Sequence, residues 1–386
     1  MLQSVKGEQK SFPSYFIGPF IETFLAYATD TRTRVNSASG GVATTLLRYL
    51  LEFNHVDAIL VPRLVVRKGV TYGVWTIVTD PSDVSKYAGS VYAPTFGLAK
   101  MIEYALKKFR RIAVTAIPCH TKVIRRLLEL RNRGKDAFII GLYCNNTPNM
   151  LATRYALNYL SIRARDIEWI KFRGYGWPGY TVIKTKNKIV HIPFLVFWDS
   201  GFGHYFYSLG CYSCTEHTNI FADISLADPW TLPREPIKKL GGATIVVVRS
   251  RRGLEVLEDA MRAGYIKAIK IDPIYAIQYA TFLKLSKRVF KRYRKSTCTL
   301  PPSFTTIAHE ILYGVGHFLT RRKSLWNFLK VYHKVIVPRI LALSSLLDHR
   351  LVKTRWGKMH KNIAYIQRLK ALKYLTITPS REDFGL

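Results

Sequence analysis

Short apolar runs alternate with amphipathic segments over most of the chain, and this alternation predicts an α/β fold. The runs at 112–117 and 137–143 contain no charged residue and have the length of a buried strand. The amphipathic segment between them completes a strand–helix–strand unit, which favours parallel pairing. Strands are predicted at 58–66, 72–78, 112–117, 137–143 and 243–249, and helices at 45–52, 96–109, 120–133 and 253–263.

Three further regions complete the predicted organisation. The apolar stretch at 16–28 predicts a helix, and residues 166–198 predict a β-rich insertion. A basic segment ends in Pro301-Pro302, beyond which the pattern is helical. We therefore expect an α/β fold with α+β elements, in which a mixed or mostly parallel sheet is flanked by helices. A first domain should span 1–286, and 287–386 should form a basic, mostly helical C-terminal extension.

Two glycine-containing segments are candidate ligand turns. Ser37-Ala38-Ser39-Gly40-Gly41 precedes a helix, and amides at a helix start suit an anionic group. A structural Gly-Gly cap explains the same residues, and the Gly-Lys-Ser/Thr ending of a P-loop is absent. Gly174–Gly179 matches Gly-x-Gly-x-x-Gly, but a strand follows it in place of a helix. We interpret that segment as a hairpin connection.

Four of the five cysteines occupy positions typical of a metal or cluster site. Cys119 and Cys144 each follow a predicted buried strand, where α/β folds build their sites, and Cys211-x-x-Cys214 forms a chelating pair. Four thiolates suit a [4Fe–4S] cluster or a structural zinc ion. Buried structural thiols are the simpler alternative. The fifth cysteine, Cys298, lies in a basic segment and has no such setting.

Other chemistry-bearing residues have simpler explanations. His120, His204 and His217 lie near the cysteines in sequence, and each could donate a proton or serve as a hydrogen-bonded structural residue. Asp223 and Asp228 flank a short apolar strand, where turn chemistry and a functional role are equally good interpretations. No catalytic residue can be assigned from these patterns.

Composition and charge narrow the class of protein. With 48% hydrophobic residues the 386-residue chain is globular, and an odd cysteine count argues against a disulfide framework. The polar start lacks an apolar signal segment, and no stretch reaches the ~18 apolar residues of a spanning helix. We therefore expect a cytoplasmic protein, which could also lie peripherally at a membrane.

The net charge of +34 is large, and half of it falls on residues 287–386. Such a field attracts polyanions, although a solvated basic surface is the plain alternative. Within this region Arg321–Lys334 combines basic and apolar residues like an interfacial helix, or like a helix packed on the domain. We expect the region to dock on an anionic membrane or an acidic redox partner.

Taken in order, these segments resemble the coenzyme F420 hydrogenase/dehydrogenase beta-subunit family over roughly residues 16–270. The resemblance rests on the following segments: Ser37-Ala38-Ser39-Gly40-Gly41, Tyr87-Ala88-Gly89-Ser90-Val91-Tyr92, Pro118-Cys119, Gly141-Leu142-Tyr143-Cys144, Cys211-x-x-Cys214 and Ala222-Asp223-Ile224-Ser225. Two segments depart from the usual family pattern: Ala116-Ile117-Pro118-Cys119-His120 stands in place of Gly-Thr-Pro-Cys-Gln, and Ala227 replaces a Gly.

The resemblance implies an iron–sulfur flavoprotein oxidoreductase. Electrons would pass between one [4Fe–4S] cluster and FAD, with hydride exchange to coenzyme F420 or a similar acceptor, and a redox partner protein or subunit is expected. The implied cluster ligands are Cys119, Cys144, Cys211 and Cys214. The implied flavin residues are Ser37, Ser39, Gly40, Gly41, Thr44, Gly89, Ser90 and Tyr92.

The competing class is a zinc-stapled, basic nucleic-acid-binding protein without catalytic activity. A compact zinc module would need closely spaced ligands, whereas these cysteines are spread along the chain from Cys119 to Cys214. No recognised nucleic-acid motif is present, so nucleic acid is not an expected partner.

Overall fold

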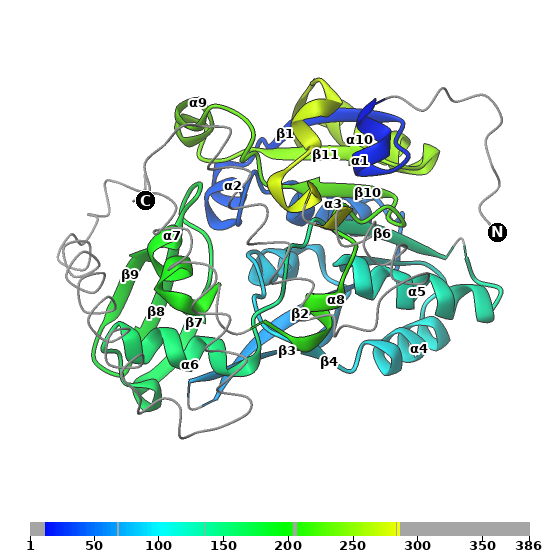
Figure 1. The fold of residues 1–386 in the computed structure, drawn as a ribbon. Coiled ribbons are helices and arrows are strands. Elements are labelled where there is room, and N and C mark those ends of the chain that lie inside the picture. Colours follow the sequence, from blue (N-terminus) through cyan, green and yellow to red (C-terminus); the bar gives the residue numbers. More distant parts are fainter. Residues whose placement is uncertain (1–11, 68, 135, 204–206, 283, 286–386) are drawn as a thin grey trace, which may run out of the picture.

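The computed structural model describes residues 12–285, except residues 68, 135, 204–206 and 283 (Figure 1). The expected C-terminal extension at 287–386, with its Arg321–Lys334 stretch, lies outside the described residues. Cys298 and His204 also lie outside them.

A nine-stranded sheet forms the centre of the described fold, in the order β12-β1-β11-β10-β6-β5-β2-β3-β4. The neighbours β2, β5, β6 and β10 run parallel, whereas β1, β11 and β12 pair antiparallel on one side and β2 pairs antiparallel with β3 on the other. The predicted α/β fold with a mixed sheet is therefore confirmed. The strands are β1 (Glu22–Ala28), β2 (Ala58–Arg67), β3 (Val70–Val78), β4 (Thr95–Phe96), β5 (Ile112–Ala116), β6 (Ala137–Leu142), β10 (Ile224–Ala227), β11 (Thr244–Val248) and β12 (Ile266–Lys270).

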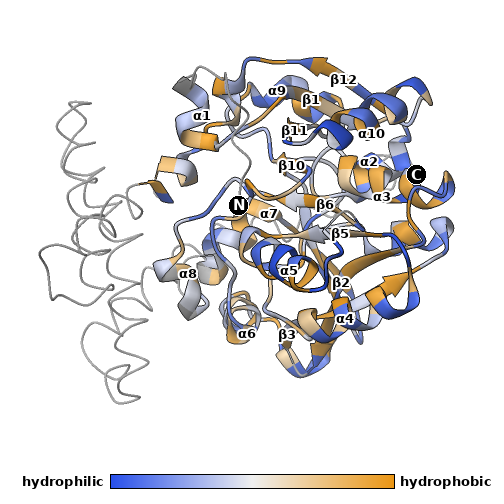
Figure 2. Ribbon diagram, turned by 90° about the vertical axis from the view of Figure 1, so that its right-hand side faces the viewer, coloured by the Kyte–Doolittle hydropathy of each residue, from blue (hydrophilic) through white to orange (hydrophobic). Residues whose placement is uncertain are grey.

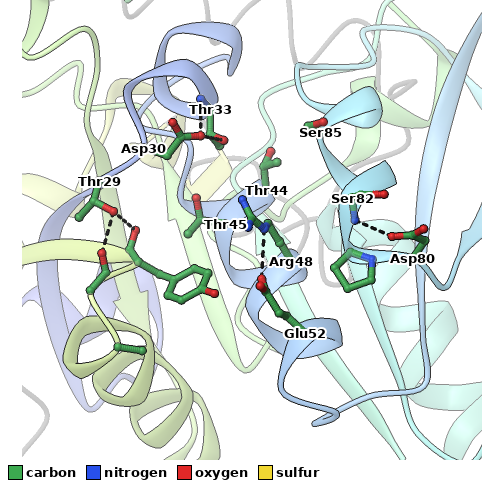
Figure 3. A pocket seen from close by; sticks show the side chains of 14 residues that line it. Thr29, Asp30, Thr33, Thr44, Thr45, Arg48, Glu52, Asp80, Ser82 and Ser85 are labelled. Carbon is green, nitrogen blue, oxygen red and sulfur yellow. Dashed lines mark hydrogen bonds and ion pairs between the residues drawn. The ribbon is translucent and has the colours of Figure 1, made fainter.

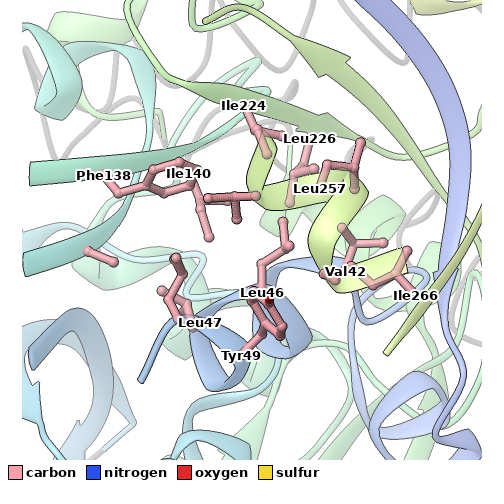
Figure 4. Close-up of a cluster of buried hydrophobic side chains, with 14 of the residues drawn as sticks. Val42, Leu46, Leu47, Tyr49, Phe138, Ile140, Ile224, Leu226, Leu257 and Ile266 are labelled. Atoms are coloured by element: carbon pink, nitrogen blue, oxygen red, sulfur yellow. The ribbon is translucent and has the colours of Figure 1, made fainter. Parts of the chain in front are cut away.

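Helices cover both faces of this sheet because its strands are apolar on both sides. In β5, Ala113 packs in one core, while Ile112 and Val114 pack in the other, as the twofold repeat of a strand requires. The first core lies against α3 (Val42–Glu52) and α10 (Arg251–Arg262), as Figure 4 shows, and η1 (Pro81–Tyr87) contributes Val84 to it. The second core lies against α4 (Leu98–Lys108) and α5 (Pro118–Leu130).

A smaller antiparallel sheet lies to one side of the large one (Figure 1). It contains β7 (Ile167–Lys171), β8 (Tyr180–Thr185) and β9 (Ile189–Pro193), so the predicted β-rich insertion and its hairpin connection are confirmed. The β structure ends before the predicted limit at residue 198, because the chain turns helical at Phe194. The helices packed here are α6 (Met150–Tyr159), η2 (Ala164–Asp166), α7 (Phe194–Phe197) and the π-helix η3 (Trp198–Phe202).

The prediction of a helix at 16–28 is wrong. The chain forms α1 (Phe12–Ile17), turns at Gly18, and then enters the sheet as β1. Gly18 has φ +79°, a backbone conformation that ends the helix, and Pro19 follows it. Strand β1 pairs on both edges, with β11 and β12, and these partners cannot be recognised from the local pattern. The other helices are α2 (Thr31–Asn36), α8 (Leu209–Ser213), α9 (Arg234–Lys239) and η4 (Pro273–Ala276).

The hydrophobic residues concentrate on the strands, whereas helix α5 carries many hydrophilic residues (Figure 2). In the part of the chain that the structure describes, no helix has both the length and the apolar character needed to cross a membrane.

Candidate functional site

The carboxyl ends of the parallel strands β5, β6 and β10 lie at one edge of the large sheet, and two predicted cysteines follow them directly. After β5 the chain enters α5 through Pro118, which suits the first turn of a helix, and Cys119 comes next. Cys144 lies two residues beyond the end of β6. The predicted positions of these cysteines at strand ends are therefore confirmed.

Residues 216–219 form hydrogen bonds at this edge of the sheet. They follow the Cys-x-x-Cys segment in the chain and so bring it to the edge. The backbone N–H of Cys144 donates to the carbonyl of His217 at 3.0 Å. The Nδ2 of Asn219, a buried residue, donates to the carbonyl of Ala116 at 2.7 Å, at the end of β5. Gly141 leaves room for this side chain, since a Cβ there would lie 2.7 Å from the Cγ of Asn219.

The loop that follows Cys144 also forms hydrogen bonds with the segment that contains Cys211. The backbone N–H of Thr147 donates to the Sγ of Cys211 at 3.3 Å, and the carbonyl of Thr147 accepts from Ser208 at 2.9 Å. A backbone N–H aimed at sulfur stabilises a thiolate, and such bonds are one means by which proteins tune iron–sulfur clusters.

The four thiols lie close enough to act on one another. Burial, together with the charges of Cys211, Cys119 and Cys214, raises the pKa of Cys144 to about 12. Cys119 is an exposed residue, yet partial desolvation of its thiol still raises its pKa, and Cys214 and Cys211 add to the increase. A negative charge on Cys211 or Cys214 therefore disfavours the thiolate forms of Cys119 and Cys144, a repulsion that a bound cationic metal centre would remove.

The side chains do not form a closed metal cage in the structure. Over residues 12–285 with the stated gaps, no three His, Cys, Asp or Glu side chains are arranged as ligands of one ion. Two observations nevertheless fit a bound group at this edge. Asn146 is 8% exposed and neither polar atom of its amide has a partner. Lys284 is buried beside Cys144, whose pKa its charge lowers.

The segment Ser37–Gly41 has structural reasons for its composition. Ser37 Oγ donates to the carbonyl of Thr33 at 2.8 Å, and Ser39 Oγ donates to the carbonyl of Ala243. A Cβ at Gly40 would lie 2.8 Å from the backbone of Ala243 and from the carbonyl oxygen of Ala26. Ser39 and Gly40 thus hold the turn against β1 and the start of β11, and Ser37 joins it to α2, which favours the structural interpretation of the Gly-Gly cap.

Gly41 and Thr44 stand at the start of α3. Gly41 is the N-cap of the helix with φ +78°, where a Cβ would lie 3.0 Å from the Cβ of Ala28. Thr44 lines a cavity of about 590 Å³ beside α3 (Figure 3). The other predicted flavin residues do not line this cavity, whose walls are mostly hydroxyls and acids: Thr29, Asp30, Thr33, Thr45, Arg48, Glu52, Asp80, Ser82, Ser85 and Tyr265.

The second predicted flavin segment, Gly89–Tyr92, lies against the β7–β8 hairpin. Gly89 has φ +117°, and a Cβ there would be 3.2 Å from the carbonyl oxygen of Arg173 and 3.4 Å from the Cε of Lys171. Tyr92 Oη accepts from Nη1 of Arg173 at 3.3 Å. Ser90 is half-buried in the same turn.

The hairpin connection also reaches the first predicted segment. The backbone N–H of Gly176 donates to the carbonyl of Val35 at 3.0 Å, and a Cβ at Gly174 would lie 3.1 Å from the carbonyl oxygen of Asn36. Residues 171–179 therefore join the two segments that were predicted, separately, to hold a flavin. The sequence pattern gave no reason to connect them, because their contact is made by a third segment.

Lys171 is a residue of this junction that sequence reasoning missed. Its Cε and Nζ would lie 2.8 Å and 3.4 Å from a Cβ at Gly174, so both glycines leave room for it. Burial lowers its pKa to about 8, and its ammonium lies 5.6 Å from the ring centroid of Tyr175. No carboxylate of the described chain pairs with it. A half-buried cation without a counter-ion suits an anionic ligand. Its position three residues before the start of the Gly-x-Gly-x-x-Gly match was the available signal.

Two of the candidate histidines can be described, the half-buried His120 and the buried His217, and burial favours the neutral form of both. Burial lowers the pKa of His120 to about 4, and its Nε2 lies 3.4 Å from Oγ1 of Thr95. Burial, with a smaller effect of Lys284, lowers the pKa of His217 to about 3, and its Nδ1 lies 2.9 Å from Oγ1 of Thr281.

The two candidate aspartates, Asp223 and Asp228, both form ion pairs. Asp223 contacts Arg125 at 3.0 Å and Arg252 at 2.7 Å, and it accepts the backbone N–H of Ile139 at 2.8 Å. Asp228 pairs with Arg173 at 2.6 Å. Of the two interpretations left open by the sequence, these contacts favour the structural one.

Two family profiles match the chain in succession. The profile described as coenzyme F420 hydrogenase/dehydrogenase, beta subunit N-term, matches residues 23–103, and the profile for the carboxyl-terminal part of the same beta subunit matches residues 109–274. These matches place the fold, with cysteines at the carboxyl edge of its central sheet, in a class of oxidoreductase subunits. The chain is a member of the coenzyme F420 hydrogenase/dehydrogenase beta-subunit family, and it is homologous to oxidoreductase subunits.

Individual relatives agree with this assignment. The chain is 30% identical over 286 residues to an F420-dependent formate dehydrogenase subunit beta of Methanocaldococcus jannaschii, covering 70% of this chain and 68% of that protein. It is 26% identical over 265 residues to formate dehydrogenase 1 subunit beta of Methanococcus maripaludis, covering 65% of this chain and 62% of that protein.

The fold has a solved counterpart. A chain of the F420-reducing [NiFe] hydrogenase complex from Methanosarcina barkeri superimposes with a TM-score of 0.55 at 17% identity, covering 78% of this chain and 96% of that one. At this identity the likeness concerns the fold.

Proposed function

We propose that the protein is an iron–sulfur flavoprotein that passes electrons between a [4Fe–4S] cluster and FAD. Hydride exchange with coenzyme F420 or a similar acceptor would complete the reaction. The observation that carries the proposal is the pair of hydrogen bonds that residues 216–219 form at the ends of β5 and β6. Through these bonds, thiols from three segments that are distant in sequence come to the edge of the sheet where α/β folds bind ligands.

The cluster would be held by Cys119, Cys144, Cys211 and Cys214. Cys211 and Cys214 raise the pKa of both Cys119 and Cys144, and this suits ligation, because a metal centre binds thiolates and removes their mutual repulsion. The N–H of Thr147 would support the Cys211 thiolate after ligation.

The flavin would lie at the junction of Gly89–Tyr92 with residues 171–179. Lys171 offers a charge for a phosphate or for the anionic edge of a reduced flavin, and nothing lies within 4 Å of a Cβ position at Gly176, where a ligand could approach the backbone. FAD accepts two electrons as hydride and releases them singly, which is the chemistry that a cluster partner requires. The protein's contribution is to hold both groups near one another, away from water.

A partner subunit would supply or remove the electrons, since the relatives are named as subunits of dehydrogenases and hydrogenases. The basic region at 287–386 remains a proposed docking segment for an acidic partner or an anionic membrane face, with a cytoplasmic location for the whole protein.

The cluster assignment is tested by iron analysis of protein purified without oxygen. Cys211→Ser should strip iron and colour, whereas Cys298→Ser, at the cysteine outside the proposed site, should keep both. Unchanged iron content in the Cys211→Ser protein would contradict the ligand assignment. Bound zinc without iron in the wild type would point to the competing class of zinc-stapled protein.

A further inference from the structure

The edge of the large sheet at β3 is only partly covered. Strand β4 pairs with β3 at Gly73 and Val74 and goes no further, so over the described residues no strand lies beside the last part of β3 on that side. The backbone N–H of Gly73 donates to the carbonyl of Pro94 at 2.8 Å, and backbone groups alternate between the two edges of a strand. The N–H and the carbonyl of Ile77 therefore face the open edge.

This open edge lacks the usual protection against pairing. Proteins commonly place lysines or other charges on exposed edge strands, because an unpaired row of backbone groups invites another strand. The opposite edge strand, β12, follows this rule with the exposed Lys267 and Lys270 (Figure 2). The open part of β3, Trp75–Val78, contains no charged residue. Such an edge is expected where pairing with another chain is useful.

A groove of about 630 Å³ lies at this edge, between β3 and α4. Successive residues of a strand point to opposite faces of the sheet, so a groove lined by the three consecutive residues 75–77 opens at the edge of the strand. On the other side the groove is lined by Lys100, Met101 and Tyr104 of α4. The lining is mostly apolar, and Tyr104 is 54% exposed.

Two groups at the groove lack a partner. Trp75 is 5% exposed, and its Nε1 has no hydrogen-bond partner in the described chain, although buried donors are almost always satisfied. Lys100 is the only charged residue that lines the groove, and no carboxylate of the described chain pairs with it. The first group needs an acceptor such as a carbonyl oxygen, and the second attracts a carboxylate.

We propose that this groove is a docking site for an extended, acidic segment of a partner protein, which adds to the large sheet as a strand beside β3. The backbone of the segment pairs with Ile77, its apolar side chains fill the groove, and a carboxylate meets Lys100. The charge of the chain favours an acidic segment, because the net charge is +34 and Lys107 and Lys108 are exposed on the same helix.

The groove lies next to the cysteine site. The ring centroid of Trp75 lies 5.7 Å from that of His120, which directly follows the exposed Cys119. A segment bound in the groove therefore holds its owner near Cys119. That this owner is the redox partner rests on the proposed function, because it requires the cluster, whereas the docking site itself does not.

The test uses the full-length protein and a synthetic probe, a fluorescein-labelled peptide of about ten residues in which valine and glutamate alternate. Binding is followed by fluorescence anisotropy. Hydrogen exchange of residues 75–78 is measured by mass spectrometry with and without the peptide. One control peptide carries lysine in place of glutamate. In another the backbone nitrogens are methylated, so that it cannot pair as a strand.

The valine–glutamate peptide should bind and slow the exchange of the Ile77 amide, whereas both control peptides should bind at least about tenfold more weakly. Tyr104→Ala should weaken binding about tenfold, because it removes a wall of the groove, and Tyr104→Phe should bind like the wild type. Lys100→Glu should weaken binding about fivefold or more, because it repels the glutamates. Lys267→Glu changes the net charge equally at the opposite edge of the sheet and should leave the affinity unchanged.

Equal peptide affinities of the wild type, Tyr104→Ala and Lys100→Glu proteins would overturn the inference. Protection of residues 75–78 in the isolated protein, with no peptide binding, would also overturn it, because a segment of this chain or a second copy would then occupy the edge. Peptide binding by a protein that holds neither iron nor flavin would keep the docking site and contradict only the proposed function.

Discussion

Arg173 and Asp228 form a two-point ion pair that joins the two sheets of the protein. Nη1 of Arg173 donates to Oδ2 of Asp228 at 2.6 Å, and Nη2 donates to Oδ1 at 3.0 Å. Arg173 follows β7 and Asp228 follows β10, so the contact ties the small sheet to the carboxyl edge of the large one. Trp177 Nε1 also donates to Oδ1 at 3.0 Å, and the guanidinium lies 4.6 Å from the ring centroid of Phe194.

Removing one partner of this pair should destabilise the fold strongly. Arg173 is 1% exposed, so Asp228→Ala would leave a buried charge without a counter-ion. We expect the free energy of unfolding in urea to fall by about 3–5 kcal/mol. The exposed pair Lys184–Glu168, 3.0 Å apart on the same small sheet, is the control, and Glu168→Gln should cost less than about 1 kcal/mol. Equal losses in the two variants would refute the role of the buried pair.

Asp223 should make the fold sensitive to acid. Burial alone would raise the pKa of Asp223, but its hydrogen bond with Arg252 and the charges of Arg125 and Arg252 lower it below its ordinary value. A lowered folded-state pKa means that the stabilisation is complete above the unfolded-state pKa of about 3.9 and is lost as the pH falls through the folded value. Urea unfolding measured from pH 6 downward, with roughly half-unit steps, should show a steeper acid loss for the wild type than for Asp223→Asn. If the stabilities of the two proteins fall in parallel as the pH is lowered, Asp223 does not contribute this pH-dependent stabilisation.

Lys171 should contribute to flavin binding without affecting the fold. Its ammonium has no anionic partner in the described chain, so Lys171→Gln removes a charge that only a ligand uses. We expect FAD affinity, measured by fluorescence quenching on flavin-depleted protein, to fall about tenfold, or ~1.4 kcal/mol. Lys184→Gln, on the neighbouring strand, should bind FAD like the wild type. A wild-type dissociation constant in the Lys171→Gln protein would place the flavin elsewhere, with the Thr44 cavity as the next site to probe.

Gly41 should matter for stability before it matters for any ligand. With φ +78° and Ala28 Cβ 3.0 Å from the position of a new Cβ, Gly41→Val would strain the start of α3. The change should lower the free energy of unfolding by more than about 1 kcal/mol. Gly134→Ala, where nothing lies within 4 Å of the new Cβ, is the control and should be near neutral. A Gly41→Val protein that is as stable as the wild type would show that the turn can relax.

The sequence was informative where local chemistry decides the outcome. Uncharged apolar runs marked β5 and β6, and Cys119 and Cys144 could be placed at their ends for that reason. The turn at Ser37–Gly41 was found, but its hydroxyls bond to Thr33 and Ala243, which no local pattern reveals.

Other features depend on contacts between distant segments. Strand β1 is defined by its partners β11 and β12, from far along the chain. Lys171 and Lys284 are two lysines among many in a chain of net charge +34, and only tertiary packing buries them beside a candidate site. Neither could be singled out from residue type, and the one local signal was the place of Lys171 shortly before the Gly-x-Gly-x-x-Gly match.

The central claim is that this chain holds an iron–sulfur cluster and a flavin together. The most direct measurement is the absorption spectrum of the full-length protein purified without oxygen, with iron and FAD quantified in the same sample. We predict flavin bands over a broad visible absorption that bleaches on reduction, with iron and FAD both present in stoichiometric amounts. A colourless protein that contains zinc, or no metal, would contradict the account.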